Sequence, residues 1–298
     1  MNYPLGLVFL CLVTISIHAE GEFEINAGLL LGHDSNVAVD EIDLVTTNGD
    51  RFLTGRFGVA YENAIDDNQS FKLSYNLSDK HYGDNEQFNL QNHLASVGYN
   101  IKHDKVTYGL TYRYVHSNLD SKRFLTISQV TPSLSWFISK KHYLRFAYTF
   151  HDKTLEDNTG RNANSHELSS DYYYFANGLN SYFIVAVKAR DEDADDELFN
   201  YSSQQLRIAY QKRFNISDHP LKASIDLRVR EREYTTQIHP SIGDFRLDET
   251  YSSSFSLEWE VGEHWLWQWN MEYADRQSNL ASVDFSQTLI SAGFEYRY

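Results

Sequence analysis

Apolar and polar residues alternate along most of this chain, in segments of about ten residues that are separated by polar breaks. A clear example reads Trp-Leu-Trp-Gln-Trp-Asn-Met-Glu-Tyr-Ala over residues 265–274. A period of two residues is the period of a β-strand, because successive side chains of a strand point to opposite faces. The pattern therefore predicts an all-β chain.

Fourteen such segments can be counted, and no Pro/Gly/Ser linker divides them. They lie near residues 22–32, 51–62, 69–78, 88–101, 105–117, 124–138, 142–152, 166–177, 180–190, 202–214, 221–233, 250–262, 264–275 and 285–298. Pro132 lies within the sixth segment, where its missing N–H predicts a bulge.

The lengths of the breaks between the segments distinguish a membrane barrel from a soluble sandwich. Long and short breaks mostly take turns along the chain. This is typical of a membrane barrel with short periplasmic turns and longer extracellular loops, whereas a soluble sandwich has no reason to keep this rhythm. The sequence predicts a single antiparallel transmembrane β-barrel of about 14 strands, located in the bacterial outer membrane with both chain ends on the periplasmic side.

The C-terminus supports a barrel. The chain stops inside its last segment, with apolar residues at every second position up to a terminal aromatic residue: Ile290, Ala292, Phe294, Tyr296 and Tyr298. This resembles the strand by which the barrel assembly machinery recognises outer-membrane proteins, so the machinery and the membrane lipid are expected partners. Such a strand must pair with the first one, because an open edge in lipid leaves backbone groups without partners.

The N-terminus predicts a signal peptide over residues 1–19, followed by the barrel over residues 20–298. Residues 5–17 form an apolar run, and the small residue Ala19 fits a cleavage site. The only cysteine, Cys11, lies inside this run, so the mature chain is expected to have no disulfide.

Composition narrows the possibilities. A mean hydropathy of −0.50 argues against a bundle of membrane helices. A net charge of −15 argues against nucleic acid as a partner, since phosphate contacts need a basic patch. Aromatic residues at segment ends fit membrane-interface girdles. Those beside short breaks are Tyr61, Trp136, Phe214, Trp259 and Trp265, and those toward long breaks are Tyr114, Tyr234 and Tyr251.

The polar face of the later segments carries a charged wall that would line the lumen. Its members are Lys188, Arg190, Arg207, Arg213, Arg228, Arg230, Arg232, Glu258, Glu260, Glu272 and Glu295. Because the eleventh and twelfth segments are neighbours, Arg228 and Arg230 are expected to meet Glu258 and Glu260. Two interpretations remain: an ion-pair ladder that holds the shape of the barrel, or a transverse field across a water-filled pore.

No motif predicts an enzyme, a cofactor or a metal site. The twelve histidines form no close His-x-x-x-His pattern, and no Gly-x-Ser-x-Gly elbow is present. A Ser/His dyad assembled in space, as in outer-membrane phospholipases, is an alternative. The acidic residues at 191–197 and 34–43 have oxygen ligands that suit Ca²⁺, but their spacing matches no EF-hand, and solvated loops explain them as well.

The first segment resembles a known family. Gly28 to Gly32 lead into Asp34-Ser35-Asn36-Val37, which is similar to the start of the C-terminal barrel of the surface lipoprotein assembly modifier proteins. The resemblance implies a barrel of similar strand number that works with a lipoprotein partner. Those proteins usually carry an N-terminal helical repeat domain, whereas here the first strand begins close to the predicted cleavage site, which favours a stand-alone pore.

Three functional hypotheses follow. The first is a pore or transport barrel for small solutes. The second is an assembly or translocation barrel that acts with a periplasmic or surface lipoprotein. The third is an outer-membrane hydrolase.

Overall fold

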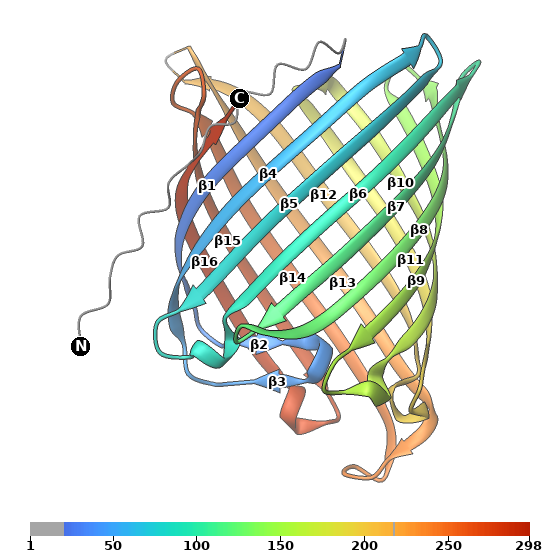
Figure 1. Ribbon diagram of the computed structural model, residues 1–298, viewed down its shortest axis with the longest axis vertical. Coiled ribbons are helices and arrows are strands. Elements are labelled where there is room, and N and C mark those ends of the chain that lie inside the picture. The colour runs from blue at the N-terminus through green and yellow to red at the C-terminus, as the bar shows by residue number, and fades with distance from the viewer. Residues whose placement is uncertain (1–20, 217) are drawn as a thin grey trace.

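Fourteen antiparallel strands close into a barrel in the computed structural model, which describes residues 21–216 and 218–298 (Figure 1). Consecutive barrel strands pair with each other, and the last strand pairs with the first. The strands are β1 (Glu22–Asp34), β4 (Asp50–Asp66), β5 (Gln69–Tyr82), β6 (Leu90–His103), β7 (Val106–Leu119), β8 (Lys122–Ser139), β9 (His142–Leu155), β10 (Ala163–Leu179), β11 (Ser181–Ala194), β12 (Tyr201–Ile216), β13 (His219–His239), β14 (Asp244–Glu260), β15 (Trp265–Ser278) and β16 (Phe285–Arg297). The predicted fold class and strand number are confirmed.

The two ends of the barrel differ. The start of β1, the C-terminus and the short turns lie at one end, the upper end in Figure 1, which we call the turn end. The opposite end, the loop end, carries the connection at residues 35–49, called loop 1, with the short strands β2 (Ala38–Val39) and β3 (Leu44–Val45) and the 3₁₀ turn η1 (Asp40–Ile42). The other 3₁₀ turns, also at the loop end, are η2 (Glu86–Phe88), η3 (Thr159–Arg161), η4 (Glu197–Phe199) and η5 (Ala281–Val283).

Each predicted segment overlaps one barrel strand, but several strands are longer than predicted. The largest difference is at β13 and β14, which run on to His239 and start again at Asp244, where the sequence indicated a long break. The side chains of residues 235–238 are exposed, so this hairpin continues into water. Beyond the membrane both faces of a hairpin can be polar, and the apolar alternation that reveals a strand is lost.

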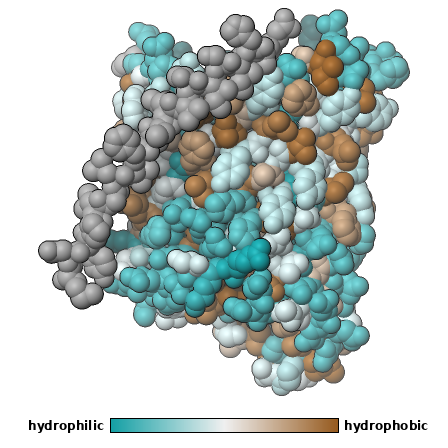
Figure 2. Space-filling view, viewed as in Figure 1, coloured by the Kyte–Doolittle hydropathy of each residue, from teal (hydrophilic) through white to brown (hydrophobic). Residues whose placement is uncertain are grey.

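The outward face is apolar where the membrane would lie. Leu29, Leu168, Val187 and Leu227 are among the exposed large apolar residues, and their neighbours in sequence point inward. Figure 2 shows apolar side chains gathered on the part of this face nearer the turn end, with hydrophilic ones dominant nearer the loop end. This is the surface that alternation in a lipid-facing wall predicts.

The prediction that Tyr234 belongs to a membrane-interface girdle is wrong. Tyr234 is buried inside the loop end, where its hydroxyl accepts a hydrogen bond from Arg232 at 3.1 Å. Tyr234 follows Arg232 at the strand period, so it shares the inward face of that arginine. Its position in the chain beside a predicted loop hid this orientation.

Pro132 does not form the predicted bulge. The ladder between β8 and β9 passes from Val130–Phe150 to Ser133–Ala147 without a change of register, and the two residues between them are unpaired on that side. A bulge needs an extra residue, whereas proline removes only a donor. The register shifts of β8 lie elsewhere, between Phe137 and Ser139 toward β9 and opposite Ser117 and Asn118 of β7.

Among the described residues, no helix is both long and apolar enough to cross a membrane. The predicted signal peptide at residues 1–19 and Cys11 lie outside the described residues, so the cleavage site stays a prediction.

Candidate functional site: the mouth and lumen of the barrel

Loop 1 folds across the mouth of the barrel at the loop end. Its apolar side chains belong to a cluster inside the wall, in which Val37 is only 1% exposed. The buried residues of this cluster come from loop 1, η2 and four strands: Val37, Val39, Phe52, Tyr82, Phe88, Phe124, Leu125 and Leu155. The main apolar core of the described protein therefore lies inside the mouth and fixes loop 1 against β4, β5, β8 and β9.

The acidic side of loop 1 is held by arginines from other parts of the barrel. Both oxygens of Asp43 accept hydrogen bonds from Arg246 of β14, at 2.8 and 2.9 Å, and Arg161 of η3 approaches the same carboxylate at 2.5 Å. Asp40 forms an ion pair with Arg276 of β15. These four bonds tie loop 1 to walls that its apolar cluster does not reach, so the loop spans the mouth.

The charge of Asp43 is strongly favoured in this setting. Burial alone would raise its pKa, but hydrogen bonds and the positive charges of Arg246 and Arg161 lower the pKa from 3.8 to about 2. A bidentate arginine–carboxylate pair is among the strongest hydrogen-bonded contacts in proteins. The pair is therefore expected to stay intact across the physiological pH range.

All members of the predicted charged wall occupy inward-facing positions, but most are neutralised locally. Glu167 forms ion pairs with Lys188 at 3.2 Å and with Arg190 at 3.0 Å. Asp226 pairs with Arg207 and lies 3.7 Å from Arg228. Glu295 pairs with Arg297 at 2.5 Å, whereas Arg213, Glu260 and Glu272 are exposed to the lumen or its rim. Much of this wall is thus an ion-pair lattice.

The expected contacts of Arg228 and Arg230 with Glu258 and Glu260 are wrong. In the antiparallel register of β13 and β14, Arg228 lies opposite Ser252 and Arg230 opposite Thr250. Glu258 lies opposite Lys222 and bonds it at 2.6 Å. Adjacent strands bring together only residues at matching heights, and Glu258 lies near the turn end, far along the strand from the two arginines.

Two arginines beneath loop 1 have no acidic partner. Among the residues that the structure describes, no carboxylate oxygen lies within 4.0 Å of a side-chain nitrogen of Arg230 or Arg232. Arg230 donates to the hydroxyl of Thr250 at 3.4 Å, and the guanidinium of Arg232 lies 4.3 Å from the ring centre of Tyr201. The Nε of Arg232 is buried without a hydrogen-bond partner.

Cavities adjoin these two guanidinium groups. One of about 160 Å³ reaches loop 1 at Asp40 and Glu41, and another of about 160 Å³ extends toward Gln205. Both are lined by Arg190, Tyr201, Arg230 and Arg232. Near the mouth, the part of the charged wall that is not neutralised is therefore positive and faces open space.

The turn end holds a larger cavity than those at the mouth. A cavity of about 620 Å³ is lined there by polar residues of the β4–β5 and β6–β7 turns and by Phe137 and Tyr143. The side chain of Arg145, which also lines it, bonds Asp171 at 3.3 Å. This cavity lies inside the wall at the turn end.

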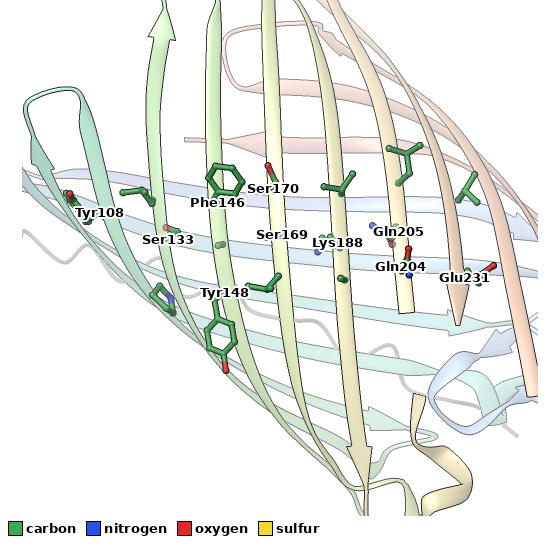
Figure 3. Close-up of a pocket in the computed structure, with 18 residues that line it drawn as sticks. Tyr108, Ser133, Phe146, Tyr148, Ser169, Ser170, Lys188, Gln204, Gln205 and Glu231 are labelled. Carbon is green, nitrogen blue, oxygen red and sulfur yellow. The ribbon is translucent and has the colours of Figure 1, made fainter. Parts of the chain in front are cut away.

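A hollow of about 1180 Å³ lies on the outer wall and not in the lumen. Figure 3 shows its lining on β7 to β13, with Phe146 and Tyr148 among the side chains of the outward face. Leu168, Val187 and Leu206 line it too and are exposed apolar residues. In a membrane barrel this surface faces lipid, so it is not accessible to solutes in the lumen.

The C-terminal strand closes the barrel as predicted from its pattern. Phe294 pairs with Leu29, Tyr296 with Ala27, and the backbone of Tyr298 exchanges two hydrogen bonds with Ile25, at 2.8 and 2.9 Å. The alternate apolar side chains lie on the outward face, and a Cβ on Gly293 would collide with the backbone of Leu29. Recognition by the assembly machinery stays a prediction.

The ion pairs of Asp40 and Asp43 in loop 1 could not be predicted from the sequence. Asp40 and Asp43 were considered only as Ca²⁺ ligands, and their arginine partners are 118 to 236 residues away in sequence. Within residues 21–216 and 218–298, no group of three or more His, Cys, Asp or Glu side chains is arranged to hold a metal ion. Glu192, from the other acidic stretch, instead points inward and pairs with Lys153.

Comparisons with known proteins show the fold. No family model matches the sequence, and no curated protein is significantly similar to it. An anion-selective porin from Comamonas acidovorans aligns with a TM-score of 0.56 at 6% identity, over 93% of this chain and 99% of the porin. A loop-deletion form of OmpT, an outer-membrane protein of Vibrio cholerae, aligns with a TM-score of 0.51 at 9% identity, over 93% and 99%.

These similarities, together with the closed barrel, show that the chain has the fold of outer-membrane β-barrels. Its fold is one that pore-forming outer-membrane proteins use. The resemblance to the lipoprotein assembly modifier family stays a prediction, as does the expectation that the chain is not an enzyme.

Proposed function

We propose that this barrel is a diffusion channel for small anionic solutes, constricted at its outer mouth by loop 1. The turn end, with the start of β1 and the C-terminus, faces the periplasm, and the loop end faces the outside. The lumen between them is lined by hydrophilic and charged side chains, as in water-filled barrels. Transport of solutes needs no further chemistry from the protein.

The unpaired arginines beneath loop 1 carry the proposal. The electric fields of the two charges of an ion pair, such as Glu167 and Lys188, nearly cancel at a distance. The field in the lumen therefore comes mainly from charges that are not paired. Arg230 and Arg232 leave such a positive charge beside cavities just inside the mouth. A ring or cluster of basic side chains at a narrow point favours anions and repels cations. The similarity of fold alone gives no selectivity, which has to come from these residues.

A reversal-potential measurement tests the selectivity. The refolded mature protein is inserted into a planar bilayer that separates two KCl concentrations, and the ratio of chloride to potassium permeability is obtained. We expect the ratio to exceed 1, and to fall by a factor of about 3 or more in the variant Arg230→Gln/Arg232→Gln. The matched control is Lys212→Gln, which removes a positive charge from an outward-facing position.

Two outcomes contradict the proposal. One is selectivity for cations in the unchanged protein, or selectivity that the double variant leaves as it was. The other is a barrel that is folded and heat-modifiable but carries no current. The second outcome favours the assembly hypothesis, which is then tested by deleting the gene and measuring the surface display of lipoproteins.

A further inference from the structure

Five aromatic rings form a continuous cluster on the inward faces of β8 to β11 at the turn end. Phe137 lies 4.9 Å from Tyr143 between ring centres, Tyr143 lies 5.5 Å from Tyr173, and Phe175 lies 5.7 Å from Tyr182. Phe137 also contacts Phe175 at 6.1 Å. The rings therefore line one side of the lumen as a single aromatic surface.

Anchoring in the membrane interface does not explain these rings. That role belongs to outward-facing aromatics such as Trp259 and Trp265, whereas Phe137 and Tyr143 border the 620 Å³ cavity inside the wall. Phe137 is 54% exposed. An apolar ring exposed to water in a polar lumen carries an unfavourable hydration free energy, which a ligand that covers the ring would relieve.

The rest of the cavity lining is polar and almost balanced in charge. Lys102, Lys105 and Arg145 are countered by Asp66 and Asp67, and Arg145 is already paired with Asp171 at 3.3 Å. Most of the other lining residues carry amide or hydroxyl groups: Asn68, Gln69, Ser70, Asn100, Thr107, Ser133 and Ser135. The cavity thus offers many hydrogen-bond donors and acceptors but little net charge.

We propose that this turn-end cavity binds the pyranose ring of a short saccharide. A pyranose has an apolar face of C–H groups, which can cover the ring of Phe137 or Tyr143, and an edge of hydroxyls that both donate and accept hydrogen bonds. Carboxylate, amide and guanidinium groups together satisfy such hydroxyls. A flat aromatic carboxylate fits less well, because it has too few hydroxyl groups to bond the many amide and hydroxyl groups of the lining. The site lies at the end opposite Arg230 and Arg232, and it does not depend on the proposed anion selectivity.

Saturation-transfer NMR on maltose tests the site without requiring any current. The full mature protein is refolded in lauryldimethylamine oxide, a detergent without a sugar headgroup. We expect saturation transfer to the ring protons of maltose, reduced by a factor of about 3 or more in Phe137→Ala and in Tyr143→Ala, since aromatic contacts contribute to affinity well beyond area alone. Tyr143→Phe, which keeps the ring, is expected to retain most of the signal. The control is Phe255→Ala, which removes an outward ring that packs on Trp269 at 5.7 Å.

Three other outcomes overturn the inference. Transfer that is equally strong in both ring variants places the sugar elsewhere. Absence of transfer to maltose and to glucuronate from the folded protein excludes a saccharide site. Transfer to benzoate but not to either sugar means that the rings select flat aromatic ligands. A positive result in a barrel that shows no anion selectivity would refute the proposed function and leave this site standing.

Discussion

Inward-facing apolar side chains are buried at the loop end of the barrel and exposed at the turn end. At the loop end, Val37 and Leu155 are each 1% exposed in a packed cluster that holds loop 1 in place. At the turn end, Phe137 borders a cavity of about 620 Å³ and remains half exposed. Packed apolar residues stabilise one structure, whereas exposed ones leave a surface for something else to cover. The loop end is thus built as a fixed constriction, and the turn end as an open vestibule.

Truncating one apolar residue at each end is the sharpest test of this contrast. We expect Leu155→Ala to lower the free energy of unfolding by about 2–5 kcal/mol, the usual cost of a cavity in a packed core. Phe137→Ala should cost less than about 1 kcal/mol, because little packing is lost at an exposed position. Urea unfolding of both variants in liposomes, followed by tryptophan fluorescence, measures the two values. Equal losses would show that the ends do not differ in this way.

The acidic contacts of loop 1 give a second test, with a pH dependence. The pKa of Asp43 is lowered from 3.8 to about 2, so its ionised form stabilises the folded mouth above pH 4. The shift corresponds to roughly 2 kcal/mol, which is lost as the pH falls from about 4 to about 2. We expect the channel current at constant ionic strength to be steady from pH 8 to about 4 and to rise below it as loop 1 is released.

The variant Asp43→Asn should remove this dependence. It keeps the shape of the side chain but not its charge, so Arg246 and Arg161 lose their shared partner. We expect a higher or noisier current already at neutral pH, because the middle of loop 1 loses its strongest bonds to the wall. Asp244→Asn, at the exposed tip of the β13–β14 hairpin, is the matched control. An acid response that survives in Asp43→Asn would assign it to other carboxylates.

Much of the barrel could be predicted because the membrane imposes a local rule. Lipid on one side of the wall requires apolar residues to alternate with lumen-facing ones. Each of the fourteen strands can therefore be recognised from its own stretch of sequence. The rule fails where the lipid ends. Tyr234 and the outer part of the β13–β14 hairpin lie beyond the apolar band, and both were misinterpreted.

The site was less predictable because its contacts are not local. The inward orientation of Arg230 and Arg232 follows from alternation, but the lack of a carboxylate partner depends on the register of β13 against β14. A one-residue change in that register would alter every pairing. The link between Asp43 and Arg246 depends on the path of loop 1, which no periodic pattern encodes. The aromatic cluster at the turn end was hidden for a related reason, since it joins rings from four strands.

The smallest expected effect concerns the ion pairs of the turn end, and it separates the two interpretations of the charged wall. Glu258 bonds Lys222 at 2.6 Å and lies 3.7 Å from Arg297, in a region open to water. Exposed pairs contribute about 0–1 kcal/mol, so Glu258→Gln should change the free energy of unfolding within that range. In 1 M salt even this difference should disappear.

If the pairs only stabilise the wall, the permeability ratio of Glu258→Gln stays as in the unchanged protein. A shift toward anions as large as the opposite shift in Arg230→Gln/Arg232→Gln would mean that the acidic side of the wall also contributes to the field. In that case the selectivity would belong to the whole lumen and not to the constriction under loop 1.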